Sequence, residues 1–358
     1  MTDIQKLECY KCKKLLAENL VLPKGLCVYC AADEADQLPQ PQKQVKVNKR
    51  EETAQLKAEK ELALRILSRK RMLPFVEKFN PDYQAGWVHK DVCRRLEKFS
   101  QDVAEKKSPR LMLFMPPRHG KSTLASIAFP AWHLGRNPDH EFISCSYSGS
   151  LAMSFSRKVR QLLREPNYKN VFENTKLDKD SQSVESWQTT ESGGYVAAGV
   201  GGGITGKGAH VLLIDDPVKN REDAESENNR EATWDWYTST AYTRLSPGGG
   251  ILVILTRWHD DDLAGKLLTA EEEGADEWEV VKYPAIAEED EEFRAAGEPL
   301  HPERYNLESL EMIQRAIGPR DWTALYQQNP VSDEGDYFTR DMVRYYEPDE
   351  IDYDRLRY

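Results

Sequence analysis

The chain has 358 residues, a charged fraction of 30%, a formal net charge of −11 and a mean hydropathy of −0.69. No apolar run approaches the roughly 18 residues of a membrane-spanning helix, so we expect a soluble protein that has no membrane partner. The acidic balance argues against nonspecific coating of nucleic acid by the whole surface, although a local basic channel is compatible with it.

Two C-x-x-C pairs mark residues 1–35, the first formed by Cys9 and Cys12 and the second by Cys27 and Cys30. The start of the chain lacks the pattern of a signal peptide, which predicts an intracellular setting where thiols stay reduced or bind metal. Each pair can place two thiolates on one tetrahedral Zn²⁺, and four thiolates leave no open position for catalysis. We therefore predict a structural zinc ribbon, with four free thiols as the alternative.

Residues 36–74 are predicted to form a linker followed by a charged helix. Residues 31–50 are rich in Gln, Pro and charge, which is typical of a flexible linker, and residues 51–73 have the composition of an exposed helix. The basic end of this helix at Arg69, Lys70 and Arg71 complements the helix dipole; contact with nucleic acid is the alternative.

Residues 75–330 alternate between apolar strands and amphipathic helices. We expect strands at 111–115, 141–146, 211–214 and 251–255, and helices at 122–134, 151–163 and 224–245. Apolar strands separated by helices predict an α/β fold with a mostly parallel sheet that helices cover on both faces. Ligands of such sheets bind at the carboxyl ends of the strands.

The loop after the first of these strands ends in Gly-Lys-Ser, as a P-loop does. Its backbone N–H groups and the following helix N-terminus would cradle phosphates. Lys121 would reach the β- and γ-phosphates of ATP, and the Ser122 hydroxyl would hold Mg²⁺. Met115 replaces the first glycine of the usual pattern. The expected nucleotide contacts are Pro117, Arg118, His119, Gly120, Lys121, Ser122 and Thr123.

Asp215 and Asp216 close the apolar strand 211–214, as in a Walker B strand. Asp215 would bind Mg²⁺ opposite Ser122, and Asp216 would orient or deprotonate the attacking water. The alternative is that the pair caps the strand before a turn at Pro217. The Gly-Lys-Ser loop favours the catalytic interpretation, because both segments end strands of one sheet.

These segments together resemble the ATPase domain of the large terminase subunit of tailed bacteriophages, the motor that packages DNA into proheads. The resemblance covers roughly residues 80–340 and is carried by MPPRHGKST, GVGGGITGKGAHVLLIDDPVKN, WDWYTSTAYTRLSPGGG, ILVILTRWHDDDLAG and QQNPVSDEGDYF. It implies a P-loop NTPase of the additional-strand type that hydrolyses ATP with Mg²⁺ and translocates double-stranded DNA. It also implies a ring of copies in the host cytoplasm at the prohead portal, with the portal protein and the small terminase subunit as partners.

The resemblance also implies roles for single residues. Terminases often carry an Arg before Gly-Lys, where Arg118 stands, and a strand-ending coupling residue that senses the γ-phosphate, where Thr256 stands. Tyr83 lies upstream of the first strand, where related ATPases stack adenine; a packed aromatic is the alternative. Lys207 stands where related ring motors carry a trans-acting Arg, but a Lys cannot form a bidentate fork.

Several positions have alternatives. The expected catalytic Glu is Asp216 here, so Glu222 or Glu225 could replace it, and Arg221, Arg230 or Arg244 could act in place of Lys207. Arg257 could contact phosphate or form a structural salt bridge. The run 258–262 is expected to start a helix rather than to bind metal, and residues 199–208 form either a mobile loop or an ordinary connection.

Residues 331–358 are expected to be a linker towards a nuclease domain that is absent from this chain. The twenty residues from Thr339 to Tyr358 cannot supply the folded sheet of carboxylates that a two-metal nuclease needs, so we expect no nuclease activity. Two other functions fit parts of the sequence. A helicase-like nucleic-acid ATPase would need a second RecA-like domain. A zinc-ribbon scaffold with an inactive nucleotide fold would not need the intact Lys121, Ser122 and Asp215.

Overall fold

The computed structural model describes residues 6–8, 15–17, 49–204 and 206–331. The chain divides into two compact units, Met1–Lys60 and Glu61–Tyr358. In the first unit, β1 Lys6–Glu8 pairs antiparallel with β2 Leu15–Ala17. The four cysteines of the predicted zinc ribbon and the predicted linker after residue 331 lie outside the described residues. No helix within the described ranges has the length and apolar character to cross a membrane.

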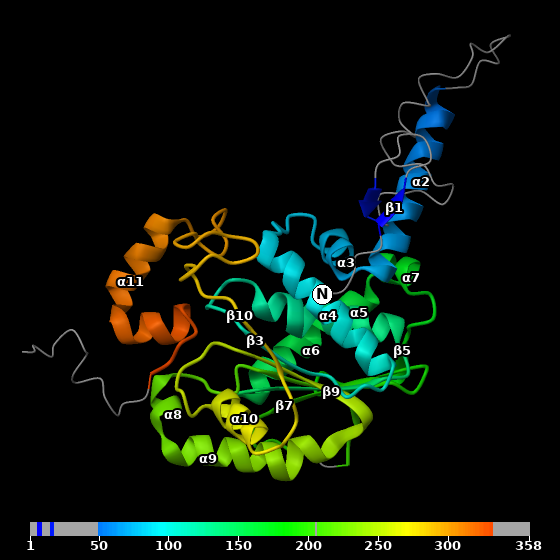
Figure 1. Ribbon diagram of the computed structural model, residues 1–358. Helices are drawn as coiled ribbons and strands as arrows, with labels where there is room; N and C mark the ends of the chain where they lie inside the picture. Colours follow the sequence, from blue (N-terminus) through cyan, green and yellow to red (C-terminus); the bar gives the residue numbers. More distant parts are fainter. Residues whose placement is uncertain (1–5, 9–14, 18–48, 205, 332–358) are drawn as a thin grey trace, which may run out of the picture. The chain divides into compact units, whose positions relative to one another are not determined.

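Among the described residues of the second unit, eight strands form one sheet in the order β10-β3-β9-β8-β4-β7-β6-β5 (Figure 1). The strands from β10 to β7 run parallel, and β6 and β5 are antiparallel additions at one edge. This confirms the predicted α/β fold with a mostly parallel sheet. The strands are β3 Arg110–Phe114, β4 Glu141–Ser146, β5 Leu177–Gln182, β6 Ser186–Thr189, β7 Gly194–Gly199, β8 Ala209–Asp215, β9 Leu245–Leu255 and β10 Glu279–Lys282.

Helices connect the strands and cover the sheet. They are α2 Lys49–Lys70, α3 Met72–Phe79, α4 Trp87–Ala104, the π-helix η2 Thr123–Ala128, α5 Phe129–Arg136, α6 Gly149–Arg164, α7 Pro166–Val171, α8 Arg221–Glu225, α9 Glu227–Trp236, η3 Tyr237–Ala241, η4 Tyr242–Arg244, α10 Leu263–Glu272, α11 Leu307–Asp321 and η5 Trp322–Tyr326. Figure 1 shows α9 and α10 on one face of the sheet and α4, α5 and α6 on the other.

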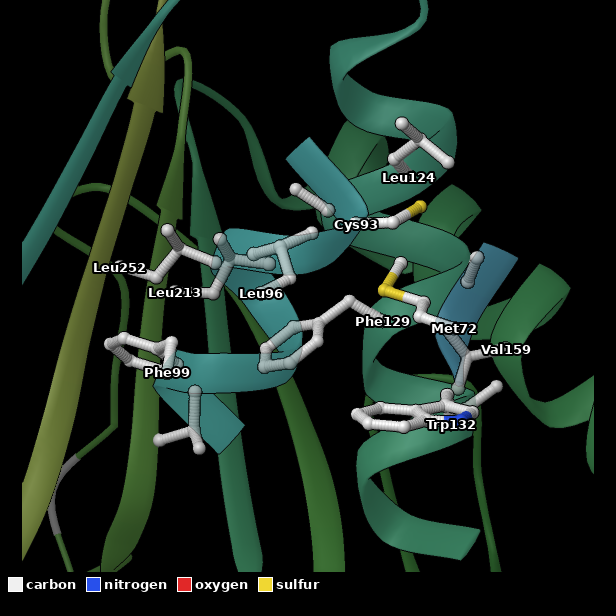
Figure 2. Close-up of a cluster of buried hydrophobic side chains, with 14 of the residues drawn as sticks. Met72, Cys93, Leu96, Phe99, Leu124, Phe129, Trp132, Val159, Leu213 and Leu252 are labelled. Atoms are coloured by element: carbon white, nitrogen blue, oxygen red, sulfur yellow. The ribbon is translucent and has the colours of Figure 1, made fainter. Parts of the chain in front are cut away.

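The central strands are apolar on both faces because helices cover both. Side chains alternate along β8, so that Val211 and Leu213 join one buried cluster while Leu212 and Ile214 join another. Figure 2 shows the first cluster, where Leu213 and the neighbouring Leu252 meet side chains of the covering helices. The two buried clusters hold the central strands rigidly, so the loops at the carboxyl ends of these strands begin at fixed positions.

Two predicted helices differ from the observed ones. The predicted helix 51–73 breaks after Lys70, because Pro74 lacks an N–H and its ring would clash with the carbonyl of residue 70. The predicted helix 224–245 is interrupted at Ser226, between α8 and α9, and its helical turns end one residue early, at Arg244. Ser226 caps α9 by accepting a hydrogen bond from the Asn229 N–H, and Leu245 pairs with Ala209 as the first residue of β9.

The apolar side chains of α2 are exposed to solvent, in keeping with the predicted exposed helix. Their exposed fractions lie between 36% and 57% for Leu56, Leu62, Leu64, Ile66 and Leu67. The strands β5, β6, β7 and β10 and the helices α4 and α11 were not predicted at all. Several of them, such as β5, carry little apolar periodicity, which is why the pattern did not mark them.

Candidate nucleotide-binding site

Three loops meet at the carboxyl edge of the sheet because β9 lies between β3 and β8. The parallel register pairs Phe114 with Leu255 and Asp215 with Ile254. The residues that follow these strand ends are therefore neighbours in space. They are Met115, which opens the predicted phosphate-binding loop, and Asp216 and Thr256, which were predicted to act at the γ-phosphate.

The loop from Met115 to Ser122 is held in a tight conformation. Gly120 has a φ of 93°, and a Cβ atom there would lie 3.2 Å from the Nε2 atom of His89. His89 Nε2 donates to the His119 carbonyl oxygen at 3.1 Å, and its Nδ1 accepts from the Gly86 N–H at 3.0 Å. Burial lowers the pKa of His89 to about 4, which keeps the ring neutral and able to accept that bond. Glycine at position 120 thus allows both the turn and this close support.

Lys121 links the loop to the other two strand ends. Its Nζ lies 2.7 Å from Asp216 Oδ2 and donates to Thr256 Oγ1 at 2.5 Å. The Thr256 N–H donates to Asp216 Oδ1 at 2.9 Å, and the Thr256 hydroxyl donates to the Met115 carbonyl oxygen at 3.2 Å. The predicted phosphate-binding lysine, water-orienting carboxylate and coupling threonine therefore form one hydrogen-bonded group.

Asp215 is buried beside this group and accepts two hydroxyl hydrogen bonds. Ser122 Oγ lies 3.3 Å from its Oδ1, and Ser126 Oγ lies 2.5 Å from its Oδ2. Burial, followed by the neighbouring Asp216 charge, raises the pKa of Asp215. Carboxylate and hydroxyl oxygens are the ligands that Mg²⁺ prefers, and a divalent cation would stabilise the ionised carboxylate. Ser122 and Asp215 therefore fit the predicted magnesium ligands.

Ser126 was not predicted, although a signal was present. It follows Ser122 by four residues, and residues four apart lie on the same face of a helix. Its hydroxyl is buried and donates to the carboxylate that Ser122 also contacts. We interpret it as a positioning residue for Asp215.

A cavity of about 370 Å³ opens over the loop. Its lining residues are Pro117, Arg118, Gly120, Lys121, Ser122, Thr123, Asp216 and Arg304. All the predicted nucleotide contacts of the loop are among them except His119. That ring is buried behind the loop, where it stacks on Tyr305 with 4.7 Å between centroids. Arg304 was not predicted, and three of the lining side chains carry a positive charge.

Tyr83 lies next to the loop as a packed aromatic. Its ring meets that of His89 edge-on at 5.5 Å, and its hydroxyl oxygen lies 3.5 Å from where a Cβ of Gly120 would be. Tyr83 is not among the lining residues of the cavity. The contacts match the packing alternative.

Lys207 lies at the other edge of the sheet from the cavity. It is exposed and lies two residues before the start of β8, whereas Asp215 ends that strand. Seven residues of strand separate the two edges by about 20 Å, so Lys207 does not reach the cavity of its own chain.

The alternative arginines differ in their partners. Arg221 forms ion pairs with Glu225 and Asp321, and Arg230 pairs with Asp261 at 3.0 Å. Arg244 donates only to the hydroxyl of the adjacent Thr243 in the described residues.

None of the remaining alternatives lines the cavity. Glu225 is paired with Arg221 and Arg320, and neither Glu222 nor Glu225 lines the cavity. Arg257 is buried, with its Nε 2.7 Å from Asp262 Oδ2 and its guanidinium over the Phe114 ring. Asp262 caps α10, as the helix-start interpretation of 258–262 predicted. Within the described ranges, no group of three or more His, Cys, Asp or Glu side chains could hold a metal ion.

Comparisons with known proteins place this geometry in a family. Residues 112–344 match the family model described as the terminase large subunit, T4likevirus-type, N-terminal. No curated protein matches the sequence. The large terminase of bacteriophage HK97 is a similar solved structure, with 14% identity, a TM-score of 0.47 and coverage of 73% of this chain and 55% of that one. This chain thus spans about half the length of that protein.

Two further solved structures are similar. The large terminase of a thermophilic bacteriophage in complex with ADP has 11% identity, a TM-score of 0.36 and coverage of 63% and 51% of the two chains. A mutant ATPase domain of the Thermus phage P74-26 large terminase has 13% identity, a TM-score of 0.41 and coverage of 65% and 93%. Because the family model matches more than half of its residues, the chain belongs to the T4-like terminase large-subunit family.

Proposed function

We propose that this chain is the ATP-hydrolysing motor domain of a phage DNA-packaging terminase, which translocates double-stranded DNA into a prohead. The observation that carries the proposal is the hydrogen-bonded group of Lys121, Asp216 and Thr256 beneath a cationic cavity. Family membership supplies the link from nucleotide chemistry to DNA packaging.

The nucleotide is ATP with Mg²⁺, bound by a P-loop of the additional-strand type. The placement of β9 between β3 and β8 supports that type. Lys121 and Arg118 would neutralise the phosphates, and Ser122 and Asp215 would hold Mg²⁺. In phosphoryl transfer such positioning and charge stabilisation account for most of the catalysis.

Asp216 activates water in this proposal. Phosphate oxygens would compete with Asp216 Oδ2 for the Lys121 ammonium, while the Thr256 N–H keeps Asp216 Oδ1 in place. The freed carboxylate oxygen can then accept a hydrogen bond from the attacking water. Thr256 bonds to both Lys121 and the Asp216 carboxylate, so it is suited to couple the γ-phosphate to movement of β9.

Copies of the chain assemble into a ring at the portal in the host cytoplasm, together with the small terminase subunit and the portal protein. A residue at the amino edge of the sheet would act on the neighbouring copy. Lys207 and Arg244 both lie there, because Ala209 pairs with Leu245 in the register of β8 and β9. Arg244 offers the fork that Lys207 lacks.

The domain organisation is part of the proposal. Residues 1–35 form a zinc ribbon, 36–74 a linker and charged helix, 75–330 the ATPase domain, and 331–358 a linker. The zinc ribbon rests on the two C-x-x-C pairs. Native mass spectrometry should find one zinc per chain, and a metal-free mass would contradict the ribbon.

Replacement of Lys121 by Ala tests the proposed function. The variant should lose ATP turnover, because the ammonium that faces Asp216 is removed from the phosphate cavity. Phosphate release is the measurement, and Lys169→Ala, an exposed site on α7, is the matched control. An unchanged rate in folded Lys121→Ala protein would overturn the site.

A further inference from the structure

We propose that Arg304 is a third phosphate-binding cation of this site, beside Lys121 and Arg118, supplied by the turn that precedes α11. The inference rests on the proposed function. The cavity is lined by the Met115–Ser122 loop, the first residue of the following helix and Asp216 after β8. Arg304 is the one lining residue that comes from none of these three segments.

The charge arrangement around the cavity favours an anionic ligand. Lys121 is already paired with Asp216 and Thr256. Among the residues that the structure describes, no carboxylate pairs with the guanidinium of Arg118 or of Arg304. Two guanidinium groups that face one cavity without counter-ions repel each other, and a polyphosphate would relieve that repulsion.

The backbone of Arg304 is fixed against the loop although its side chain is exposed. Tyr305 stacks on His119 at 4.7 Å, and His301 meets His89 edge-on at 4.6 Å. The N–H groups of Arg304 and Tyr305 both donate to the His301 carbonyl oxygen, at 3.1 and 2.8 Å, which closes a turn. His89 itself bonds to the His119 carbonyl. The rings of His301 and Tyr305, on the two sides of Arg304, therefore hold this turn against the phosphate-binding loop.

The chemistry of the side chain selects the phosphate chain rather than the base. A guanidinium offers a planar fork that matches two phosphate oxygens. Arg304 would supply such a fork to the nucleotide of its own chain, whereas Lys207 cannot supply one to a neighbouring copy. The ligand class is a nucleoside triphosphate or diphosphate, recognised through its phosphates.

The test compares Arg304→Ala and Arg304→Lys in the full chain, with Arg315→Ala on α11 as the control. Arg315 is exposed, and its one ion pair within the described part of the chain is a long one with Glu311 at 3.9 Å. Binding of ATP, GTP and inorganic tripolyphosphate is measured by titration calorimetry with Mg²⁺, and turnover by phosphate release. Arg304→Ala should weaken all three ligands by about ten- to a hundredfold, because a charge-assisted hydrogen bond is lost. Arg304→Lys should recover part of the loss, and Arg315→Ala should bind as the unaltered chain does.

Two results would overturn the role of Arg304. One is unchanged binding and turnover in Arg304→Ala while Lys121→Ala abolishes turnover, which leaves the proposed function standing. The other is weaker ATP binding with unchanged tripolyphosphate binding, which would assign Arg304 to the nucleoside. Equal melting temperatures without ligand verify that the variants fold.

Discussion

At the scale of single residues, Asp216 connects Lys121 to Thr256 through its carboxylate. Its φ of 45° lies in the left-handed region, which Asp and Asn enter more readily than other side chains. One carboxylate oxygen is fixed by the Thr256 N–H, and the other faces Lys121. The backbone conformation thus directs the Asp216 carboxylate to both Lys121 and Thr256.

Replacement of Asp216 by Asn should separate catalysis from folding. Asn tolerates the same φ and keeps an oxygen for the Thr256 N–H, but it loses the charge that would orient the attacking water in the proposed mechanism. We expect turnover to fall by about a hundredfold to ten-thousandfold, while ATP still binds. Phosphate release and calorimetry measure the two effects, with the exposed Asp235→Asn as the control. Full activity in Asp216→Asn would remove Asp216 from the mechanism.

At the scale of elements, one carboxylate joins α4 to the segment that follows β10. Asp91 on α4 is buried and lies 2.6 Å from Arg94 and 2.8 Å from Arg95, and it accepts from the Tyr283 hydroxyl at 2.7 Å. These partners hold the pKa of Asp91 below its usual 3.8 even though burial opposes them. The contact positions the chain that continues towards His301 and Arg304.

Replacement of Asp91 by Asn should cost about 2 kcal/mol of unfolding free energy, because a buried charge-assisted group loses its charge. The pKa is depressed in the folded state, so the contribution is complete above pH 3.8 and lost as the pH falls below it. Urea unfolding should therefore show a constant difference from pH 7 to 5 that shrinks in stronger acid. Exposed Asp82→Asn should show no difference. A difference that grows on acidification would contradict this account.

At the scale of the whole molecule, histidines make stability depend on pH. Burial lowers the pKa of His89, His119 and His140 to about 4, and that of His133 well below 6.5. The unfolded chain gains protons on these groups below pH 6.5, whereas the folded chain does not. The free energy of unfolding therefore decreases as the pH is lowered. Burial also lowers the pKa of His301, while the raised pKa values of Asp215 and Asp262 act in the opposite direction, so two carboxyl groups oppose five histidines.

Between pH 6.5 and 5.5 we expect the unfolding free energy to fall by about 2 to 4 kcal/mol. Chemical denaturation without nucleotide measures it. His133→Gln should make the dependence shallower, because it removes a fully buried histidine that pairs with Ser100 and His140. A midpoint that stays constant over this range would show that these rings are solvated.

The sequence alone determined the features that depend on a few contiguous residues. Gly-Lys-Ser after an apolar strand, the Asp pair after another and Thr256 at the end of a third were enough to predict a sheet edge that binds phosphate. Parallel strands place their carboxyl ends together, so each local pattern had a predictable neighbour. The zinc ribbon stays a prediction, because its cysteines lie outside the described residues.

Only the tertiary structure decided which charged side chains reach the cavity. Arg304 lies far along the chain from Lys121, and its position depends on rings of His89, His119 and Tyr305 that no pattern connects. Arg257, adjacent to the coupling threonine, is instead buried against Asp262. Similarly, pairing with β8 makes Leu245 a strand residue rather than the end of a helix. The same physical reason applies to Arg304, Arg257 and Leu245. Packing and strand pairing between distant segments override the local preference of a residue, and the charge of a side chain alone does not specify its partner.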